Sequence, residues 1–163
     1  FRSLDEAVTL ANETRRRNGK VVWTNGCFDL FHIGHYEYLK FAAKQGGLLI
    51  VGINSDESAR RVKGAGRPIT GEMERARVLA ALDVVDVIVI FEEETPARQI
   101  AAIRPEVLVK GADYRLEDVV GHEQVESWGG RVALAPIVEG FSTTELVNRI
   151  LKLHGNNAGE PPE

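Results

Sequence analysis

Hydrophobic residues along the chain recur with two different spacings. Leu4, Ala7, Val8 and Ala11 share one helical face, which predicts a helix over residues 3–17. Short apolar runs that are typical of buried strands follow at 20–24, 48–53, 85–91, 107–110 and 131–135. Further helices are expected at about 33–44, 70–82, from 95 onward and 143–153. This alternation predicts a single α/β domain: a Rossmann-like parallel sheet of about five strands with helices on both faces.

Two segments do not fit this alternation. Residues 54–68 are polar and rich in Lys, Arg and Gly, so we expect a long loop, which in compact domains often serves function. The last residues are Gly, Asn, Pro and Glu, which predicts a disordered tail over 154–163 behind a domain that spans 1–153. The chain starts with Phe1 and not with Met, as expected of a trimmed chain or of one cut from a longer parent.

Composition narrows the classes of function. The 163 residues carry a formal net charge of -4, so nothing indicates binding to nucleic acid. No apolar run approaches the roughly 18 residues that a membrane helix needs, and we expect no membrane partner. With Cys27 as its single cysteine the chain can form no internal disulfide, which fits a reducing compartment and predicts a cytoplasmic protein.

The segment between the first strand and the next helix carries the most chemistry. It reads Thr24-Asn-Gly-Cys-Phe-Asp-Leu-Phe-His-Ile-Gly-His35. A helix N-terminus after a parallel strand attracts anions, and Gly26 and Gly34 let backbone and phosphate approach closely. His32 and His35 lie on one face of the first helical turn, where both can donate hydrogen bonds to phosphate oxygens. A purely structural histidine remains the alternative for either. The two histidines could in principle bind zinc, but the sequence shows no cluster that would supply further ligands.

A second phosphate-binding segment is expected at the start of the last helix. Ser142 and Glu145 have the spacing of a capping box, which alone explains both residues. The hydroxyl groups of Ser142, Thr143 and Thr144, with the helix amides, can also hold the β- and γ-phosphates of a nucleotide. The two interpretations are compatible.

Cationic residues in the middle of the chain are the next candidates. Glycines around Lys63 and Arg67 allow this stretch to fold over a ligand. Lys110 and Asp113 flank a Gly turn at the end of the fourth strand, where packing does not explain a charge, so we expect them in the site. The remaining basic residues of this part have solvent exposure or ion pairing as their ordinary explanation: Arg60, Arg61, Arg75 and Arg77.

His32-Ile-Gly-His35 resembles the signature of the HxGH nucleotidyltransferases, which include cytidylyltransferases and class I aminoacyl-tRNA synthetases. The synthetases are longer and usually carry a Lys-Met-Ser-Lys-Ser loop, which is absent here. From Val21 to Leu151 the chain is similar to the adenylyltransferase domain of bacterial ADP-heptose synthases. The matching segments are 24–29, 32–35, 51–56, Lys63 with Arg67-Pro68, 78–82, 85–86, 94–96, 108–114 and 142–144.

The resemblance implies transfer of AMP from ATP to D-glycero-β-D-manno-heptose 1-phosphate, with release of pyrophosphate and with Mg²⁺ bound to ATP. It implies no dedicated metal ligand on the chain, and relatives are often homodimers. Catalysis would fall to His32, His35 and Lys63. Acceptor binding would fall to Asp29, Arg67, Lys110 and Asp113. The nucleotide would be held by Asn25, Gly26, Cys27, Phe28, Gly34, Phe141, Ser142, Thr143 and Thr144.

One departure from the wider family concerns the donor nucleotide. Glycerol-3-phosphate cytidylyltransferases carry an arginine shortly before Ser-Thr-Thr, where this chain has Ile137-Val-Glu-Gly140. The missing cation favours ATP over CTP. The alternatives are a cytidylyltransferase for glycerol 3-phosphate or a related polyol or aminoalcohol phosphate, an FMN adenylyltransferase, and a nucleotide sensor without catalytic activity.

Overall fold

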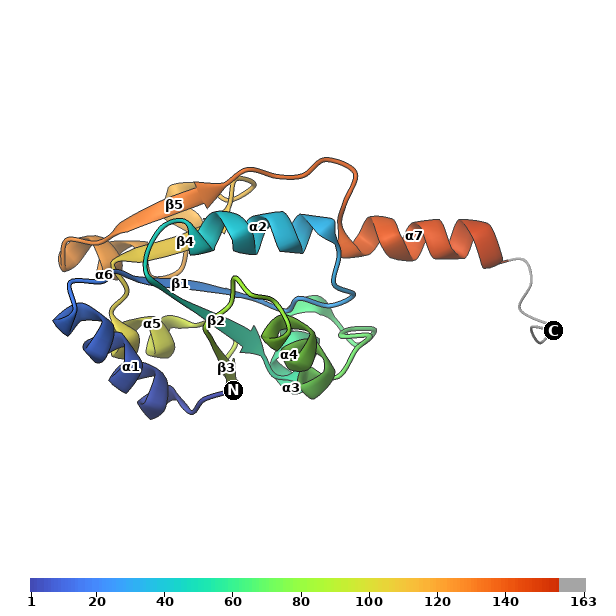
Figure 1. Ribbon diagram of the computed structural model, residues 1–163. Coiled ribbons are helices and arrows are strands. Elements are labelled where there is room, and N and C mark those ends of the chain that lie inside the picture. Colours follow the sequence, from blue (N-terminus) through green and yellow to red (C-terminus); the bar gives the residue numbers. More distant parts are fainter. Residues whose placement is uncertain (156–163) are drawn as a thin grey trace.

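The computed structural model describes residues 1–155, which form one sheet with helices on both faces (Figure 1). The five strands are parallel and lie in the order β3-β2-β1-β4-β5. Their bounds are β1 Val21–Gly26, β2 Leu48–Asn54, β3 Val87–Phe91, β4 Val107–Gly111 and β5 Arg131–Ala135. The Rossmann-like fold expected from the alternating pattern is therefore confirmed.

Each face of the sheet is covered by its own helices. Helices α2 (Ile33–Ala43) and α4 (Glu72–Ala80) pack Leu39, Ala42 and Leu79 against one face. Helices α1 (Leu4–Arg16), α5 (Ala97–Ile103) and α6 (His122–Ser127) bury small and branched residues against the other. These strands are apolar on both faces because both faces are covered.

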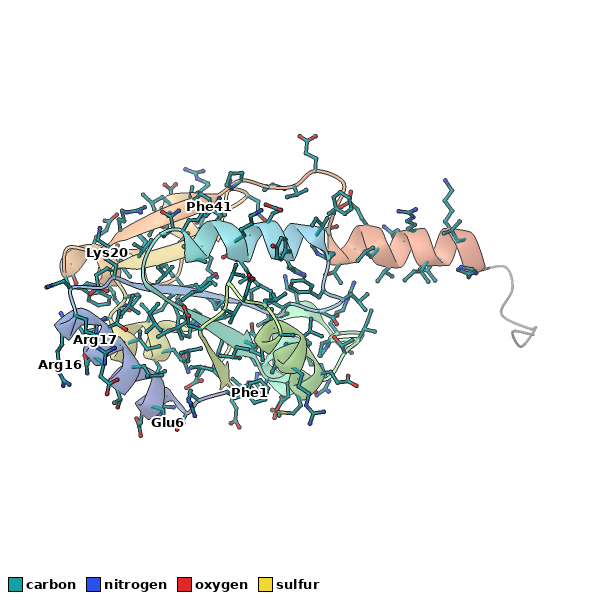
Figure 2. All side chains as sticks on the ribbon, viewed as in Figure 1. Phe1, Glu6, Arg16, Arg17, Lys20 and Phe41 are labelled. Carbon is teal, nitrogen blue, oxygen red and sulfur yellow. The ribbon has the colours of Figure 1, made fainter. Side chains whose placement is uncertain are left out.

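Local signals explain where the first helix lies. Ser3 and Glu6 form a reciprocal capping box that starts α1. Figure 2 shows Glu6, Arg16 and Arg17 pointing away from the body, while Ala7 and Ala11 on the opposite side are fully buried. The helix follows the apolar spacing of the sequence.

The polar stretch 54–68 differs from its expected form as a long loop. It contains α3 (Asp56–Lys63), which Ser55 caps by accepting a hydrogen bond from the Ser58 N–H at 3.1 Å. The side chain of Thr70, expected to cap the next helix, bonds to Asp29, and α4 begins after Gly71. The 3₁₀ turn η1 (Leu116–Asp118) and α6 had no clear apolar period in the sequence.

The sheet opens between β1 and β4, where the strand order reverses. These strands pair only at Val22–Val107 and Trp23–Leu108. Beyond that point side chains bridge the gap: the Thr24 and Tyr38 hydroxyls donate to the Val109 carbonyl at 3.1 Å and 3.0 Å. In open parallel sheets ligands bind in the crevice at such a reversal.

The last helix, α7 (Thr143–His154), extends away from the body (Figure 1). All twelve of its residues are partly or fully exposed. It ends one residue beyond the expected bound. The rest of the expected disordered tail, from residue 156 onward, lies outside the described residues. Among the described residues, no helix is both long and apolar enough to cross a bilayer.

Candidate active site

A cavity of about 540 Å³ lies in the crevice at the carboxyl ends of the strands. All sixteen residues that the sequence nominated for the site line it. They come from the β1–α2 segment, the end of α3 and the stretch after it, the end of β4, and the start of α7. Residues far apart in the chain therefore meet in one place, as the topology requires.

The two histidines stack on each other at the start of α2. Their ring centroids are 3.8 Å apart with an interplanar angle of 22°. His32 is the N-cap, and its Nδ1 accepts a hydrogen bond from the His35 N–H at 3.3 Å. A neutral imidazole that accepts at Nδ1 carries its proton on Nε2. His32 thus caps the helix and keeps a second nitrogen that can donate to a ligand.

Burial keeps both histidines neutral. The pKa of His35 is lowered to about 3, mainly by burial and also by the nearby His32, while Asp29 opposes the shift. Burial also lowers the pKa of His32. Nδ1 of His35 is buried without a hydrogen-bond partner among the described residues. The pair therefore offers N–H donors near pH 7, not positive charges.

The N-termini of α2 and α7 face each other across a short gap (Figure 1). A Cβ atom added at Gly34 would lie 3.0 Å from the Phe141 carbonyl oxygen and 2.9 Å from Nδ1 of His32. Only a glycine lets the two helices start this close together. Two partly positive helix ends that point at one cavity favour an anion between them.

Ser142 caps α7 as the sequence predicted. Its hydroxyl accepts a hydrogen bond from the Glu145 N–H at 3.1 Å. This is one of the two hydrogen bonds of the expected capping box. Thr143 instead donates its hydroxyl proton to the carbonyl of Asp29 at 2.8 Å, which ties α7 to the histidine-bearing segment.

The basic residues between Arg61 and Arg67 separate into two groups. Lys63, the last residue of α3, and Arg67 line the cavity. Arg61 turns away, because its guanidinium donates to Glu57 at 2.6 Å and to the Glu92 carbonyl. Arg67 donates to Asp29 at 3.0 Å and is only partly exposed.

Lys110, near the end of β4, brings a further cation to the cavity. Its ammonium donates to the Asn25 carbonyl at 3.3 Å and lies 5.7 Å from the Tyr114 ring centroid. Burial lowers the pKa of Lys110 to about 8, and Asp113 acts in the opposite direction. Asp113 also lines the cavity and is exposed.

Asp29 lines the cavity, but protein donors surround its carboxylate. The Ile69 N–H, the Thr70 N–H and hydroxyl, and Arg67 all donate to it at 2.9–3.0 Å. These bonds hold the pKa of Asp29 below its usual range against the effect of burial. The geometry ties this carboxylate to the 67–70 stretch, and its role in acceptor binding stays a prediction.

Sequence reasoning missed several lining residues. Tyr38 is a core-facing residue of α2, and nothing in the period distinguished it from a packing tyrosine. In the segment after β5 the sequence indicated only the absence of an arginine, although Ala135–Val138 form a wall of the cavity. Its position after a strand end was the available signal.

Among the described residues, no group of three or more His, Cys, Asp or Glu side chains could hold a metal ion. Magnesium at nucleotide sites is commonly held by one or two carboxylates and the substrate phosphates. The carboxylate of Asp113 lines the cavity and is exposed. Asp113 is thus a lining carboxylate that a magnesium ion bound to the phosphates of a ligand could contact.

Residues 23–149 match the sequence model of the cytidylyltransferase-like family. A protein of Geotalea uraniireducens named Bifunctional protein HldE is 54% identical over 92% of this chain and 31% of its own length. A protein of the same name from Koribacter versatilis is 56% identical over 88% of this chain and 30% of its own length. The chain thus spans about a third of the length of these curated relatives.

Two solved structures share the fold. The lipopolysaccharide core biosynthesis protein of Thermoplasma volcanium is 27% identical, with a TM-score of 0.60 over 74% of this chain and 97% of that one. A pantoate-beta-alanine ligase from Francisella tularensis, solved with a form of ATP and β-alanine, is 14% identical, with a TM-score of 0.60 over 93% of this chain and 77% of that one. The second likeness concerns the fold alone.

Proposed function

Since the chain belongs to the cytidylyltransferase-like family of nucleotidyltransferases, we propose that it transfers AMP from ATP to a sugar 1-phosphate. The acceptor we propose is D-glycero-β-D-manno-heptose 1-phosphate, and the products are ADP-heptose and pyrophosphate. Relatives named Bifunctional protein HldE, and a solved structure named for lipopolysaccharide core biosynthesis, support this substrate class.

One observation carries the proposal. A stacked histidine pair at the start of α2 faces the start of α7 across a cavity that Lys63 and Lys110 also line. Two helix N-termini and two lysines converge on a space large enough for a nucleotide. Such a site stabilises several phosphate groups at once.

The reaction is an in-line displacement at the α-phosphorus of ATP. A phosphate oxygen of the acceptor forms the new bond to this phosphorus, and the bond to the bridging oxygen of pyrophosphate breaks. The attacking oxygen is already anionic, so no general base is needed. Positioning and electrostatic stabilisation remain as the tasks of the protein.

The residues divide these tasks by their place in the cavity. His32 and His35 donate neutral N–H groups to the charge that develops on the α-phosphate. Lys63 bridges the two reacting phosphates. The start of α7, with Ser142, binds the leaving pyrophosphate. Magnesium bound to ATP would neutralise phosphate charge, and the carboxylate of Asp113, which lines the cavity, would contact the metal.

ATP is the proposed donor because of a residue in the segment that follows β5. Ile137 lines the cavity where cytidylyltransferases for glycerol 3-phosphate carry an arginine. An isoleucine offers dispersion contacts and no charge. Lys110 and Asp113, at the end of β4, would meet the sugar phosphate and its hydroxyl groups.

A donor and acceptor matrix tests the proposal. ATP or CTP is supplied with heptose 1-phosphate or glycerol 3-phosphate, pyrophosphate is followed and products are identified by mass. We expect ADP-heptose from the first pair. Formation of CDP-glycerol without ADP-heptose would overturn the proposed substrates, and only the nucleotidyl transfer would stand. No turnover with any pair would favour a nucleotide sensor.

The other partners expected from the sequence remain proposals. A homodimer is testable by sedimentation velocity over a concentration series, in which a monomer at all concentrations would contradict it. The expected lack of nucleic-acid binding is tested by a gel shift with a random DNA duplex at two salt concentrations.

A further inference from the structure

Arg75 is a buried cation that the proposed reaction does not use directly. It lies on α4 with 2% of its surface exposed, behind the wall of the cavity. Arg77, two residues later on the same helix, is exposed. A charge is costly to bury unless it is fully hydrogen-bonded, so the surroundings of Arg75 show what its burial achieves.

The guanidinium of Arg75 binds four acceptors in three segments of the site scaffold. Its Nε donates to Thr70 O at 3.0 Å, Nη1 to Cys27 O at 2.6 Å, and Nη2 to Asn54 O and Asp56 Oδ1, both at 2.8 Å. Asp56 alone is a charged partner. A planar fork with several fixed donors can satisfy these acceptors together, whereas a single ammonium cannot.

One of these acceptors, the Cys27 carbonyl, lies on the histidine-bearing segment, next to strained backbone. Phe28 and Leu30 have φ angles of 50° and 46°, in the left-handed region that side chains other than Asn and Asp seldom adopt. Such conformations persist where the surroundings over-determine them. Here Arg75 holds the Cys27 carbonyl on one side of Phe28, and Thr143 holds the Asp29 carbonyl on the other.

The bond to Cys27 also fixes the direction of the next amide. The Cys27–Phe28 peptide is trans and planar, so its N–H points opposite to its carbonyl. The carbonyl points to Arg75, which is buried and does not line the cavity, whereas Phe28 does line it. Within the described residues, no backbone carbonyl accepts a hydrogen bond from the Phe28 N–H.

We propose that Arg75 is a positioning residue that aims the Phe28 N–H at a phosphate oxygen of the bound nucleotide. It acts through the Cys27–Phe28 peptide and does not touch the substrate. The inference rests on the proposed function for the identity of the ligand, a nucleoside triphosphate. It adds a residue, outside the cavity, on which the phosphate cradle depends.

The test compares Arg75→Lys with Arg77→Lys, a matched change on the same helix. Two readouts are needed: steady-state pyrophosphate release, and the ¹⁵N–¹H resonance of the Phe28 amide during titration with ATP. A misplaced group can cost on the order of a hundredfold in rate. We therefore expect kcat/KM of Arg75→Lys to fall about a hundredfold, and Arg77→Lys to match the wild type.

The amide resonance separates positioning from a general effect on stability. In the wild type and in Arg77→Lys, saturation with ATP should shift the Phe28 signal downfield. In Arg75→Lys this shift should be lost, while strand amides keep their native positions. If Arg75→Lys does not fold, Asp56→Asn replaces it, since it removes the charged partner of Arg75 and should reduce the same shift.

The outcomes distinguish this inference from the proposed function. A wild type that binds ATP with the Phe28 shift but releases no pyrophosphate with any acceptor removes the reaction and leaves the positioning role. Turnover without a Phe28 shift, or an equal shift in Arg75→Lys, overturns the positioning role. A wild type that does not bind ATP overturns both.

Discussion

At the residue scale, burial lowers the pKa of His35 and of Lys110, two of the nitrogen bases that line the cavity, and so favours the neutral form of each. For His35 the pKa of about 3 leaves an uncharged ring at any physiological pH. For Lys110 the pKa of about 8 leaves the ammonium mostly charged at pH 7 and neutral above pH 9. The histidine therefore acts by hydrogen bonding and the lysine by charge, which leads to different tests.

His35→Ala removes one N–H donor from the proposed transition state. We expect kcat to fall on the order of a hundredfold or more. Affinity for ATP should change far less, because the donor acts mainly on charge that develops during reaction. Pyrophosphate release and ATP titration measure the two effects, with His154→Ala on exposed α7 as the control. Activity within a factor of about three of the wild type would remove the assigned role.

Lys110 should give the reaction an alkaline limit. The ammonium carries its charge below its pKa and loses it as the pH rises through about 8. We expect kcat/KM for the acceptor to decrease with an apparent pKa near 8 in a profile from pH 6.5 to 9.5. Lys110→Arg keeps its charge throughout this range and should show no such limb. If kcat/KM of that variant decreased near pH 8 as in the wild type, the titrating group would be another residue.

At the scale of elements, β1 and β2 approach each other closely at Gly52 and Trp23. A Cβ atom at Gly52 would lie 2.4 Å and 2.5 Å from two ring carbons of Trp23, which is fully buried. We expect Gly52→Ala to lower the free energy of unfolding by about 1–3 kcal/mol, the usual cost of overpacking a core. Urea denaturation measures it. Gly66→Ala, which meets nothing within 4 Å, should change it little.

The sequence predicted the elements whose apolar period is strong, and it missed those whose period is weak. All five strands and the helices α1, α2 and α7 lie close to their expected bounds. Helix α3 was missed because its eight residues are mostly polar, with Ser58 and Ala59 as its buried contacts. The start of α4 was misplaced because the expected cap, Thr70, bonds across space to Asp29.

Site residues could be nominated where topology alone brings them together. Residues that follow parallel strands meet at one sheet edge, so His32, Lys110 and Ser142 needed no knowledge of side-chain packing. The contacts of Arg75 and Asp29 could not be assigned in this way, because the hydrogen bonds of their side chains reach residues up to 48 positions away in the chain. Long-range hydrogen bonds leave no periodic trace in a sequence.

At the scale of the whole molecule, buried neutral histidines make the fold sensitive to acid. The pKa of His35 is lower in the folded chain than its ordinary value of 6.5, so between pH 6.5 and about 3 the unfolded chain binds more protons. Stability is therefore lost as the pH falls through this window. At pH 5.5 we expect the folding equilibrium constant to drop roughly tenfold from this group.

Urea denaturation at pH 7.5 and 5.5 measures that change. His35→Gln cannot take up this proton and should lose less stability on acidification than the wild type. Asp29 does not interfere, because its pKa lies below its usual range and its contribution is lost only at more acidic pH. Equal losses in the two proteins would place the acid sensitivity elsewhere.

Helix α7 has one further consequence, since all of its residues are at least partly exposed while its first turn borders the cavity. Helices without a buried face open with little free energy, so amide hydrogens of α7 should exchange with solvent deuterium quickly. A triphosphate held by its first turn should slow this exchange and leave that of β1 unchanged. Equal exchange with and without ATP would contradict the coupling. Deuterium uptake in α7 would thus report whether the site is occupied by nucleotide, without a fluorescent label and without turnover.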